Sequence, residues 1–237
     1  MKNLDPVTVV LPSKNHEKSI FLNIEKLLRF LDENFAEYQI MIISNGSTKQ
    51  NVKQLDNEVF ENEKIDISII DPLGKGHAVK HGLNNSKFNH VILFDSDFSY
   101  DVELIHKVYQ KGVPIAPFVC ARRVVNRELF STLSLLRYFA GITFNFAVRR
   151  FLKINSKDTQ AGFKFIDKSR FQQFSKFYSN DYLYDVELFL LAQKYNIETK
   201  EICVRSLNTP LGSNIKLFSD SLIMLRNLYK IKKHYLP

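Results

Sequence analysis

Short aliphatic runs alternate with segments whose apolar residues recur at helical spacing, and this alternation limits the chain to an α/β fold. The expected strands are Val7 to Leu11, Tyr38 to Ile43, Ile65 to Ile70, His90 to Phe94 and Pro114 to Ala121. One helical face carries Ile20, Ile24, Leu27, Leu28 and Leu31, and Ala78 to Leu83 opens a second helix. Strands separated by helices build a mostly parallel central sheet flanked by helices on both faces. Ligands of such sheets bind beyond the carboxyl ends of the strands, so candidate site residues are sought there.

The second half of the chain has a different pattern. Its expected elements are an aromatic-rich helix over 126–153, a strand at Gly162 to Ile166, a helix at Asp181 to Tyr195, a strand at Glu198 to Val204 and a basic helix from about Lys216. No internal repeat or linker separates the two halves, and 237 residues suit one hydrophobic core. We therefore expect residues 1–237 to form a single domain.

The charge balance favours anionic partners. Lys and Arg number 33 against 25 Asp and Glu, which gives a formal net charge of +8. Such an excess suits nucleotides, phosphates or acidic lipid head groups. Nucleic acid is not expected as a partner, because nothing besides the net charge points to it.

Cysteine usage and hydropathy predict a cytoplasmic protein without a membrane span. Cys120 and Cys203 both lie in apolar, strand-like runs, which is typical of reduced core thiols. The N-terminal residues contain no apolar stretch as long as that of a signal peptide. The longest apolar stretch, Leu129 to Leu152, is interrupted by Arg137 and by two further arginines near its end, whereas a membrane helix needs about 20 residues largely free of charge.

An acidic pair follows the fourth expected strand. Asp95 and Asp97 come directly after Phe94, and in extended backbone residues two apart project to the same side. Two carboxylates at a strand's carboxyl end suit Mg²⁺ or Mn²⁺, which prefer hard oxygen ligands and often take the others from substrate phosphates. A solvated turn, or the cap of a following helix, would explain the same residues. The pair therefore predicts a divalent metal site for a nucleotide diphosphate, with the turn as the alternative.

A glycine-rich segment follows the third expected strand. Gly74 and Gly76 flank Lys75 just before a helix. Glycines allow close approach of the backbone, and a helix N-terminus with a lysine attracts an anion. The spacing is not that of a Walker loop. The segment predicts a phosphate-binding turn, and an ordinary glycine turn stays open.

Further polar candidates lie in the second half. Asp158 and Gln160 stand just before a short strand, in what is by itself an ordinary loop. Asp185 and Glu187 lie in an expected helix, where solvent-facing positions are the simpler expectation unless the helix lines a cleft.

Two arginines lie next to apolar segments. Arg122 ends the fifth strand and Arg137 lies inside the aromatic helix. Arginines beside apolar surface can bind a phosphate while that surface meets lipid tails. The aromatic helix can equally be part of the core.

Taken in order, these segments resemble family 2 glycosyltransferases of the GT-A fold, and among them the dolichyl-phosphate glucosyltransferase and dolichyl-phosphate mannose synthase group. The resemblance covers almost the whole chain and rests on Val9 to Asn15, Gly74 to Ala78, Asp95 to Asp97, Cys120 to Arg122, Asp158 to Lys164, Tyr184 to Leu188 and Gly212 to Asn214. The stretch Asp158 to Lys164 differs from the group's Asp-Thr-Gln-Cys-Gly-Phe-Lys only at Ala161.

The resemblance implies an inverting transferase. It would move a hexose from a nucleotide diphosphate sugar, UDP-glucose or GDP-mannose, to a polyprenyl or dolichyl phosphate, with peripheral contact to the cytoplasmic face of a membrane. The first half, about 1–121, would bind the donor and the second, about 122–237, the acceptor. Asp95 and Asp97 would hold Mg²⁺ or Mn²⁺, and Asp185 would join them at the catalytic centre. Donor contacts would come from Pro12, Lys14, Asn15, Glu17, Asn45, Gly74, Lys75, Gly76 and Ser96, and acceptor contacts from Arg122, Arg137, Asp158 and Gln160.

Three places depart from the group's pattern. His16 stands where the group has Glu, and Glu17 can take that role. Ser44 and Asn45 replace two Asp residues that help to hold the nucleotide base. Asn214 replaces a Lys, which removes one expected phosphate contact.

Other functions fit parts of the pattern. A family 2 enzyme acting on a polysaccharide precursor would use Asp185 or Glu187 as general base. A catalytically silent nucleotide-sugar-binding protein would explain the changes at Ser44 and Asn45. A sugar nucleotidyltransferase is disfavoured, because its glycine-rich loop would follow the first strand, where this chain has Pro12 to Asn15.

Overall fold

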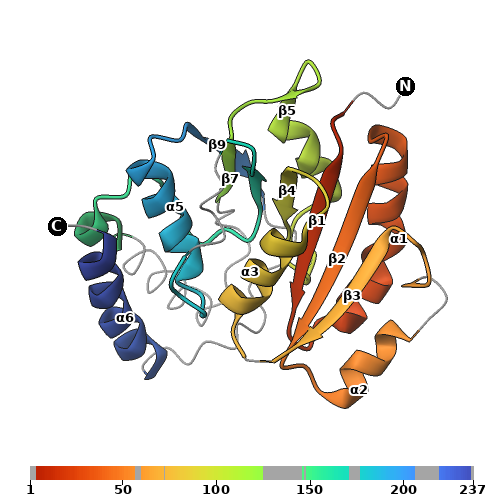
Figure 1. The fold of residues 1–237 in the computed structure, drawn as a ribbon, viewed down its shortest axis with the longest axis horizontal. Coiled ribbons are helices and arrows are strands. Elements are labelled where there is room, and N and C mark those ends of the chain that lie inside the picture. Colours follow the sequence, from red (N-terminus) through yellow and green to blue (C-terminus); the bar gives the residue numbers. More distant parts are fainter. Residues whose placement is uncertain are drawn as a thin grey trace.

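A seven-stranded sheet forms the centre of the molecule (Figure 1). The computed structural model describes residues 4–56, 60–71, 73–124, 146, 148–170, 177–205 and 219–235. The sheet has the order β3-β2-β1-β4-β8-β7-β9. Its strands are β1 (Val7–Ser13), β2 (Tyr38–Asn45), β3 (Ile65–Ile70), β4 (His90–Leu93), β7 (Phe118–Arg123), β8 (Lys164–Asp167) and β9 (Thr199–Val204).

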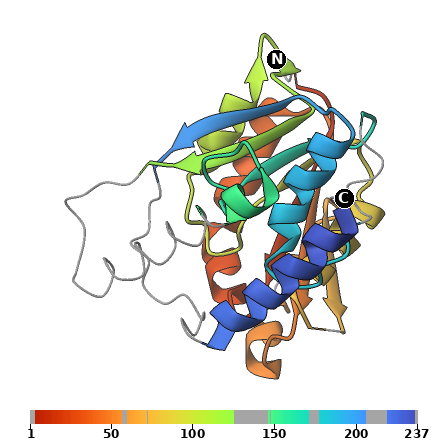
Figure 2. The same ribbon diagram turned by 90° about the vertical axis from the view of Figure 1, so that its left-hand side faces the viewer.

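Helices cover both faces of this sheet (Figures 1 and 2). They are α1 (Glu17–Asn34), α2 (Lys49–Val52), α3 (Lys75–Asn85), α5 (Tyr184–Lys194) and α6 (Ser219–Tyr235), with 3-10 turns at Lys53–Leu55 and Val102–Val108. A small hairpin of β5 (Tyr109–Gln110) and β6 (Val113–Pro114) stands apart from the main sheet.

The strand directions explain where a ligand site can form. β1 runs parallel to β2 and β4, β2 runs parallel to β3, and β7 runs parallel to β9. Only β8 is antiparallel to its neighbours, β4 and β7, within the described sheet. The carboxyl ends of β1 to β4 therefore meet at one edge, as the sequence predicted.

Two apolar clusters form the core, one on each face of the sheet. Alternate residues of a strand point to opposite faces, so Val9 packs with α1 residues such as Ile24, while Val10 packs with α3 residues such as Val79. Because helices cover both faces, β1 is buried at every residue. This explains why the strands read as continuous aliphatic runs.

The predicted mostly parallel α/β architecture is confirmed. The fifth expected strand differs, since Pro114 belongs to the small hairpin and β7 begins only at Phe118. Pro117, which has no backbone N–H to pair, separates the two. Of the aromatic helix expected over 126–153, residues 148–152 are helical, and positions 125–145 lie outside the described residues.

The structure tests two further expectations, that both cysteines lie in the core and that no helix spans a membrane. Cys120 is buried, as predicted, but the expectation of a core position is wrong for Cys203, which is exposed because alternate residues of the edge strand β9 face outwards. Burial raises the pKa of the Cys120 thiol to about 12. Across the part of the chain that the structure describes, no helix has both the length and the apolar character needed to cross a membrane.

Candidate functional site

The turn after β4 places the acidic pair at the edge where the parallel strands end. The Phe94 N–H donates to the Val10 carbonyl at 3.0 Å, so sheet pairing continues up to Asp95. The Phe98 N–H then donates to the Asp95 carbonyl at 3.0 Å, and Asp97 Oδ1 accepts from the Ser99 N–H at 2.9 Å. The turn expected as an alternative is thus present, and it fixes the backbone that presents both carboxylates.

Lys75 lies directly against Asp95. Its Nζ is 2.5 Å from Asp95 Oδ1. Burial alone would raise the pKa of Asp95, but the positive charge of Lys75 outweighs it, so the pKa falls below its usual value. Burial would likewise lower the pKa of Lys75, yet the negative charge of Asp95 holds it well above the usual value. The glycine-rich segment and the acidic pair therefore meet at one point.

Gly162 closes the other side of Asp95. A Cβ at this position would collide with the Asp95 carboxylate, so only glycine fits. Gly162 precedes β8, which pairs with β4. The segment Asp158 to Lys164, the most specific part of the resemblance, thus packs against the acidic turn.

A second, fully buried ion pair lies nearby. Lys164 Nζ is 2.7 Å from Asp185 Oδ1, and the two side chains are 1% and 6% exposed. Lys164 also donates to the Ala161 carbonyl at 2.7 Å. Burial, followed by the charge of Asp185, holds the pKa of the neighbouring Tyr184 well above its usual value. The pair ties β8 to the first turn of α5.

The expectation that Asp185 and Glu187 face solvent is wrong. Asp185 is 4% exposed and Glu187 is fully buried. The cause is the packing of α5, in which every residue from Tyr184 to Ala192 is buried. The helix is covered on all sides, so the apolar spacing in its sequence does not define an exposed face.

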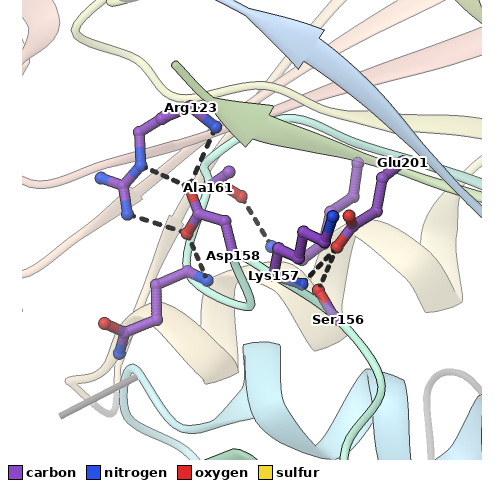
Figure 3. A network of polar contacts seen from close by, with 8 residues as sticks. Arg123, Ser156, Lys157, Asp158, Ala161 and Glu201 are labelled. Carbon is purple, nitrogen blue, oxygen red and sulfur yellow. Dashed lines mark hydrogen bonds and ion pairs between the residues drawn. The ribbon is translucent and has the colours of Figure 1, made fainter. Parts of the chain in front are cut away.

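Asp158 accepts hydrogen bonds from Arg123 and Gln160 of the same chain (Figure 3). Its carboxylate accepts from Nε and Nη2 of Arg123 at 2.7 and 2.9 Å, from the Arg123 N–H at 3.1 Å and from the Gln160 N–H at 3.3 Å. Burial would raise the pKa of Asp158, and the Arg123 guanidinium lowers it instead. Asp158 therefore joins the end of β7 to the loop before β8. Arg122 and Gln160 are half-buried beside it, and Arg137 lies outside the described residues.

Glu201 holds the same loop from the other side, as Figure 3 shows. Its carboxylate accepts from Ser156 Oγ at 2.7 Å and from the Lys157 N–H at 2.5 Å. Since Glu201 belongs to β9, the loop is fixed to two neighbouring strands, β7 and β9.

The turn after β1 is joined to the loop after β2. Asn15 adopts a left-handed backbone, with φ of 62°, and its Oδ1 accepts from the Thr48 N–H and from Asn51 Nδ2. Glu17 is fully buried, and its Oε1 accepts from the hydroxyls of Ser44 and Ser47. Its Oε2 has no hydrogen-bond partner among the described residues.

Asn45 connects β2 to the glycine-rich segment. Its Oδ1 accepts from the Gly74 N–H at 2.6 Å, and its Nδ2 donates to the Ile70 carbonyl at 3.3 Å. An aspartate could make the first contact but not the second, because a carboxylate has no donor. The amide at position 45 therefore suits this chain's own backbone.

The other predicted donor residues have different exposures. Pro12 is buried in β1 opposite Ile43, and Ser96 is buried between the two carboxylates of the turn. Lys14 is exposed.

The acidic pair suits a divalent cation in the chemistry of its donor atoms. Asp95 and Asp97 supply carboxylate oxygens, the ligands that Mg²⁺ and Mn²⁺ prefer. Within the described ranges, no group of three or more His, Cys, Asp or Glu side chains is placed to hold a metal ion. Phosphate and water oxygens would complete the coordination.

Sequence reasoning left two buried site residues without a role. Lys164 and Tyr184 form or adjoin the buried ion pair, yet only their positions in the motifs were noted. A lysine between two phenylalanines in a strand, as in Phe163-Lys164-Phe165, is the available signal, because a buried lysine requires an anionic partner.

Comparison with known proteins identifies the family of the chain. Residues 8–174 match the family model described as "Glycosyl transferase family 2". Proteins named dolichyl-phosphate beta-glucosyltransferase are similar over nearly the whole chain: that of Dictyostelium discoideum is 26% identical, covering 100% of this chain and 78% of its own, and that of Saccharomyces cerevisiae is 27% identical, covering 97% and 75%.

Solved structures share the fold. Glucosyl-3-phosphoglycerate synthase of Mycobacterium tuberculosis, in complex with Mn²⁺ and UDP-glucose, superposes with a TM-score of 0.68 at 14% identity, covering 95% of this chain and 78% of its own. Mannosyl-3-phosphoglycerate synthase of Rubrobacter xylanophilus gives 0.68 at 16% identity, covering 97% and 74%. The predicted GT-A fold is confirmed. From its sheet, its acidic turn and the match over residues 8–174, the chain belongs to glycosyltransferase family 2.

Proposed function

We propose that the protein transfers a hexose from a nucleotide diphosphate sugar to a polyprenyl phosphate of the dolichyl type. The observation that carries this proposal is the contact of Lys75 with Asp95 at the carboxyl edge of the parallel strands, in the turn that also carries Asp97. It is supported by the names of the relatives that match 97–100% of the chain, which are dolichyl-phosphate glucosyltransferases.

In this proposal the carboxyl edge binds the donor. Asp95 and Asp97 would hold Mg²⁺ or Mn²⁺, a Lewis acid that neutralises charge on the departing diphosphate. Lys75 adds a cation beside Asp95, in a partly buried setting that strengthens electrostatic stabilisation of developing charge. The complexes of glucosyl-3-phosphoglycerate synthase with Mn²⁺ and UDP-glucose, which share this fold, support this chemistry.

The acceptor phosphate supplies the nucleophile. Its second pKa lies near about 6, so it is largely ionised at neutral pH and needs no strong general base. A phosphate oxygen attacks the anomeric carbon, the bond from that carbon to the diphosphate oxygen breaks, and the nucleoside diphosphate leaves with the bonding electrons. Arg122, Arg137 and Gln160 would bind the acceptor phosphate. Asp158 and Asp185 act through their ion pairs with Arg123 and Lys164.

The contacts of the helical acids favour a phosphate acceptor over a saccharide hydroxyl, which would require a base. Asp185 is paired with Lys164, and Glu187 accepts from two backbone N–H groups and the Tyr235 hydroxyl. Neither carboxylate is free to take a proton from a hydroxyl. This weighs against the polysaccharide alternative.

A membrane surface would present such an acceptor, and we place peripheral contact at the outer side of α6. Phe146, Phe151 and Tyr229 are exposed, and Lys232 Nζ lies 4.2 Å from the centre of the Phe151 ring. Aromatic rings next to basic side chains suit the interface of an anionic bilayer.

Calorimetry with three donors tests the proposal. UDP-glucose, GDP-mannose and UDP-N-acetylglucosamine are titrated with Mn²⁺ and with chelator, and the donor that binds is then supplied with a short polyprenyl phosphate. We expect metal-dependent binding of one donor and transfer of its sugar. Asp97→Ala should reduce kcat at least about 100-fold, while the exposed control Glu103→Gln should not. If no donor binds with metal present, the transferase proposal fails. If a donor binds but its sugar is not transferred, a catalytically silent nucleotide-sugar-binding protein becomes the better description.

A further inference from the structure

The glycine-rich segment rests on the loop that precedes α5. The Gly76 N–H donates to the Asn180 carbonyl at 3.0 Å. A Cβ at Gly74 would collide with the Asn180 carbonyl, and a Cβ at Gly76 with the Ser179 carbonyl. Since the backbones touch without intervening side chains, the position of Lys75 depends on where residues 178–183 lie.

Glu187 of α5 holds that loop through its backbone N–H groups. It is fully buried, and its carboxylate accepts from the Tyr178 N–H at 2.7 Å and from the Ser179 N–H at 2.6 Å. Hydrogen bonds from N–H groups to a carboxylate are roughly twice as strong as those between neutral groups. The Tyr178 and Ser179 N–H groups lie next in the chain to the Ser179 and Asn180 carbonyls that contact the two glycines. Glu187 therefore acts on the glycine-rich segment indirectly, through this loop.

The C-terminal helix completes the arrangement. The Tyr235 hydroxyl donates to Glu187 Oε2 at 2.6 Å, and burial together with this bond raises the pKa of Tyr235. Asn227 Nδ2 donates to Asp181 Oδ2 at 3.0 Å, at the other end of the loop. The ring of His234 stacks on that of Tyr178 at 5.8 Å. Figure 2 shows α6 lying along α5 at the surface, so the helix reaches the loop at both ends.

We infer that Glu187 is a positioning residue which, together with Tyr235 and Asn227 of α6, holds the loop 178–183 against the glycine-rich segment and thereby sets the affinity for the diphosphate of the donor. The affinity part rests on the proposed function, since it assigns the diphosphate to Lys75. The positioning part stands on the contacts alone.

Amide hydrogen exchange tests the positioning part without any ligand. Tyr235→Phe removes one hydroxyl at the surface end of the network and leaves the aromatic packing in place. We expect exchange of the amides in the segment 74–80 and of Tyr178 and Ser179 to become about tenfold faster, as for the loss of one hydrogen bond to a charged group. Tyr229→Phe is the matched control for exchange, because its hydroxyl belongs to an exposed residue of the same helix, and it should leave amide exchange in these segments unchanged.

Variants of the carboxylate supply a second measurement. Glu187→Gln replaces one acceptor oxygen by a donor that faces a backbone N–H, so exchange in the same segments should accelerate further. Residues that act through one network are not additive. Adding Tyr235→Phe to Glu187→Gln should therefore change exchange less than it does in the wild type. If Glu187→Gln does not fold, the Asn227→Ala and Tyr235→Phe variants carry the test.

Calorimetry with UDP and Mn²⁺ addresses the affinity part. We expect Tyr235→Phe to weaken UDP binding about tenfold and to leave the KM for the lipid phosphate unchanged, a separation that general destabilisation would not produce. Unchanged exchange in the segment 74–80 overturns the inference. Faster exchange with unchanged UDP affinity overturns its affinity part. If exchange is faster in Tyr235→Phe but the wild type binds no UDP, the positioning part is supported and the proposed function is contradicted.

Discussion

Ser44 and Glu17 behave as a matched pair of residues. The group that this chain resembles has an aspartate at the position of Ser44, whereas here a hydroxyl donates to a fully buried glutamate at 3.0 Å. A carboxylate in place of the hydroxyl would face another carboxylate. The change at position 44 is therefore consistent with the shift of the acid from position 16 to position 17.

Ser44→Asp tests this pairing. Because it buries a second negative charge beside Glu17, we expect the free energy of unfolding to fall by on the order of 3 kcal/mol in urea titrations. Adding Glu17→Gln should restore most of the loss, since the amide can donate to the new carboxylate. Equal stability of Ser44→Asp and the wild type would contradict the pairing.

Asp158 makes the stability of the protein depend on pH. Its pKa lies below the usual 3.8, because Arg123 outweighs the effect of burial. A carboxyl whose pKa is lower in the folded state stabilises the fold above the unfolded pKa, and the contribution is lost as pH falls through the folded value. Asp158→Asn should therefore be less stable than the wild type at pH 7, and the difference should shrink below about pH 4. Urea titrations of the wild type and the variant at pH 7 and below about pH 4 check this.

The buried strands of the first half were predictable from the sequence, and the ion pairs were not. Strands such as β1 and β2 are buried on both faces, so continuous aliphatic runs in the sequence predict them. Asp95 and Gly74 could be placed from their positions after strands. The two members of each ion pair come from different elements, however. Lys75 meets Asp95, and Lys164 meets Asp185, only because α3, β8 and α5 pack in this way. The burial of α5 on all sides likewise has no periodic signature.

Lys164→Met tests the connection between β8 and α5. Removing one partner leaves Asp185 buried and unpaired, so unfolding should become easier by about 3 to 5 kcal/mol. The double variant Lys164→Met, Asp185→Leu should recover most of this. Lys200→Met, at an exposed pair on β9, should stay within about 0.5 kcal/mol of the wild type by thermal or urea unfolding. A single variant as stable as the double would argue against a coupled pair.

At the scale of the whole molecule, the net charge of +8 bears on where the protein acts. We expect it to bind vesicles that contain anionic lipid, and to bind them less as salt screens the attraction. Replacing the exposed Lys230 and Lys233 of α6 by Gln should weaken vesicle binding about tenfold or more, at about 1 kcal/mol per basic residue. Ile69→Ser, which removes an exposed apolar side chain on β3, is the control. Equal binding to neutral and anionic vesicles would remove the electrostatic part of this proposal.

The antiparallel strand β8 has a consequence for how the chain matures during synthesis. It inserts between β4 and β7, and it brings Gly162 beside Asp95 from a distant part of the sequence. Contacts between distant segments form late, because closing a long loop costs entropy before any contact is gained. The early strands can pair as soon as they emerge from the ribosome, but Asp95 can meet Gly162, and Gly76 can meet Asn180, only after those later residues have been made. The proposed nucleotide sugar donor would therefore stabilise only chains in which these late contacts have formed, and would offer no help to shorter chains that are still being synthesised.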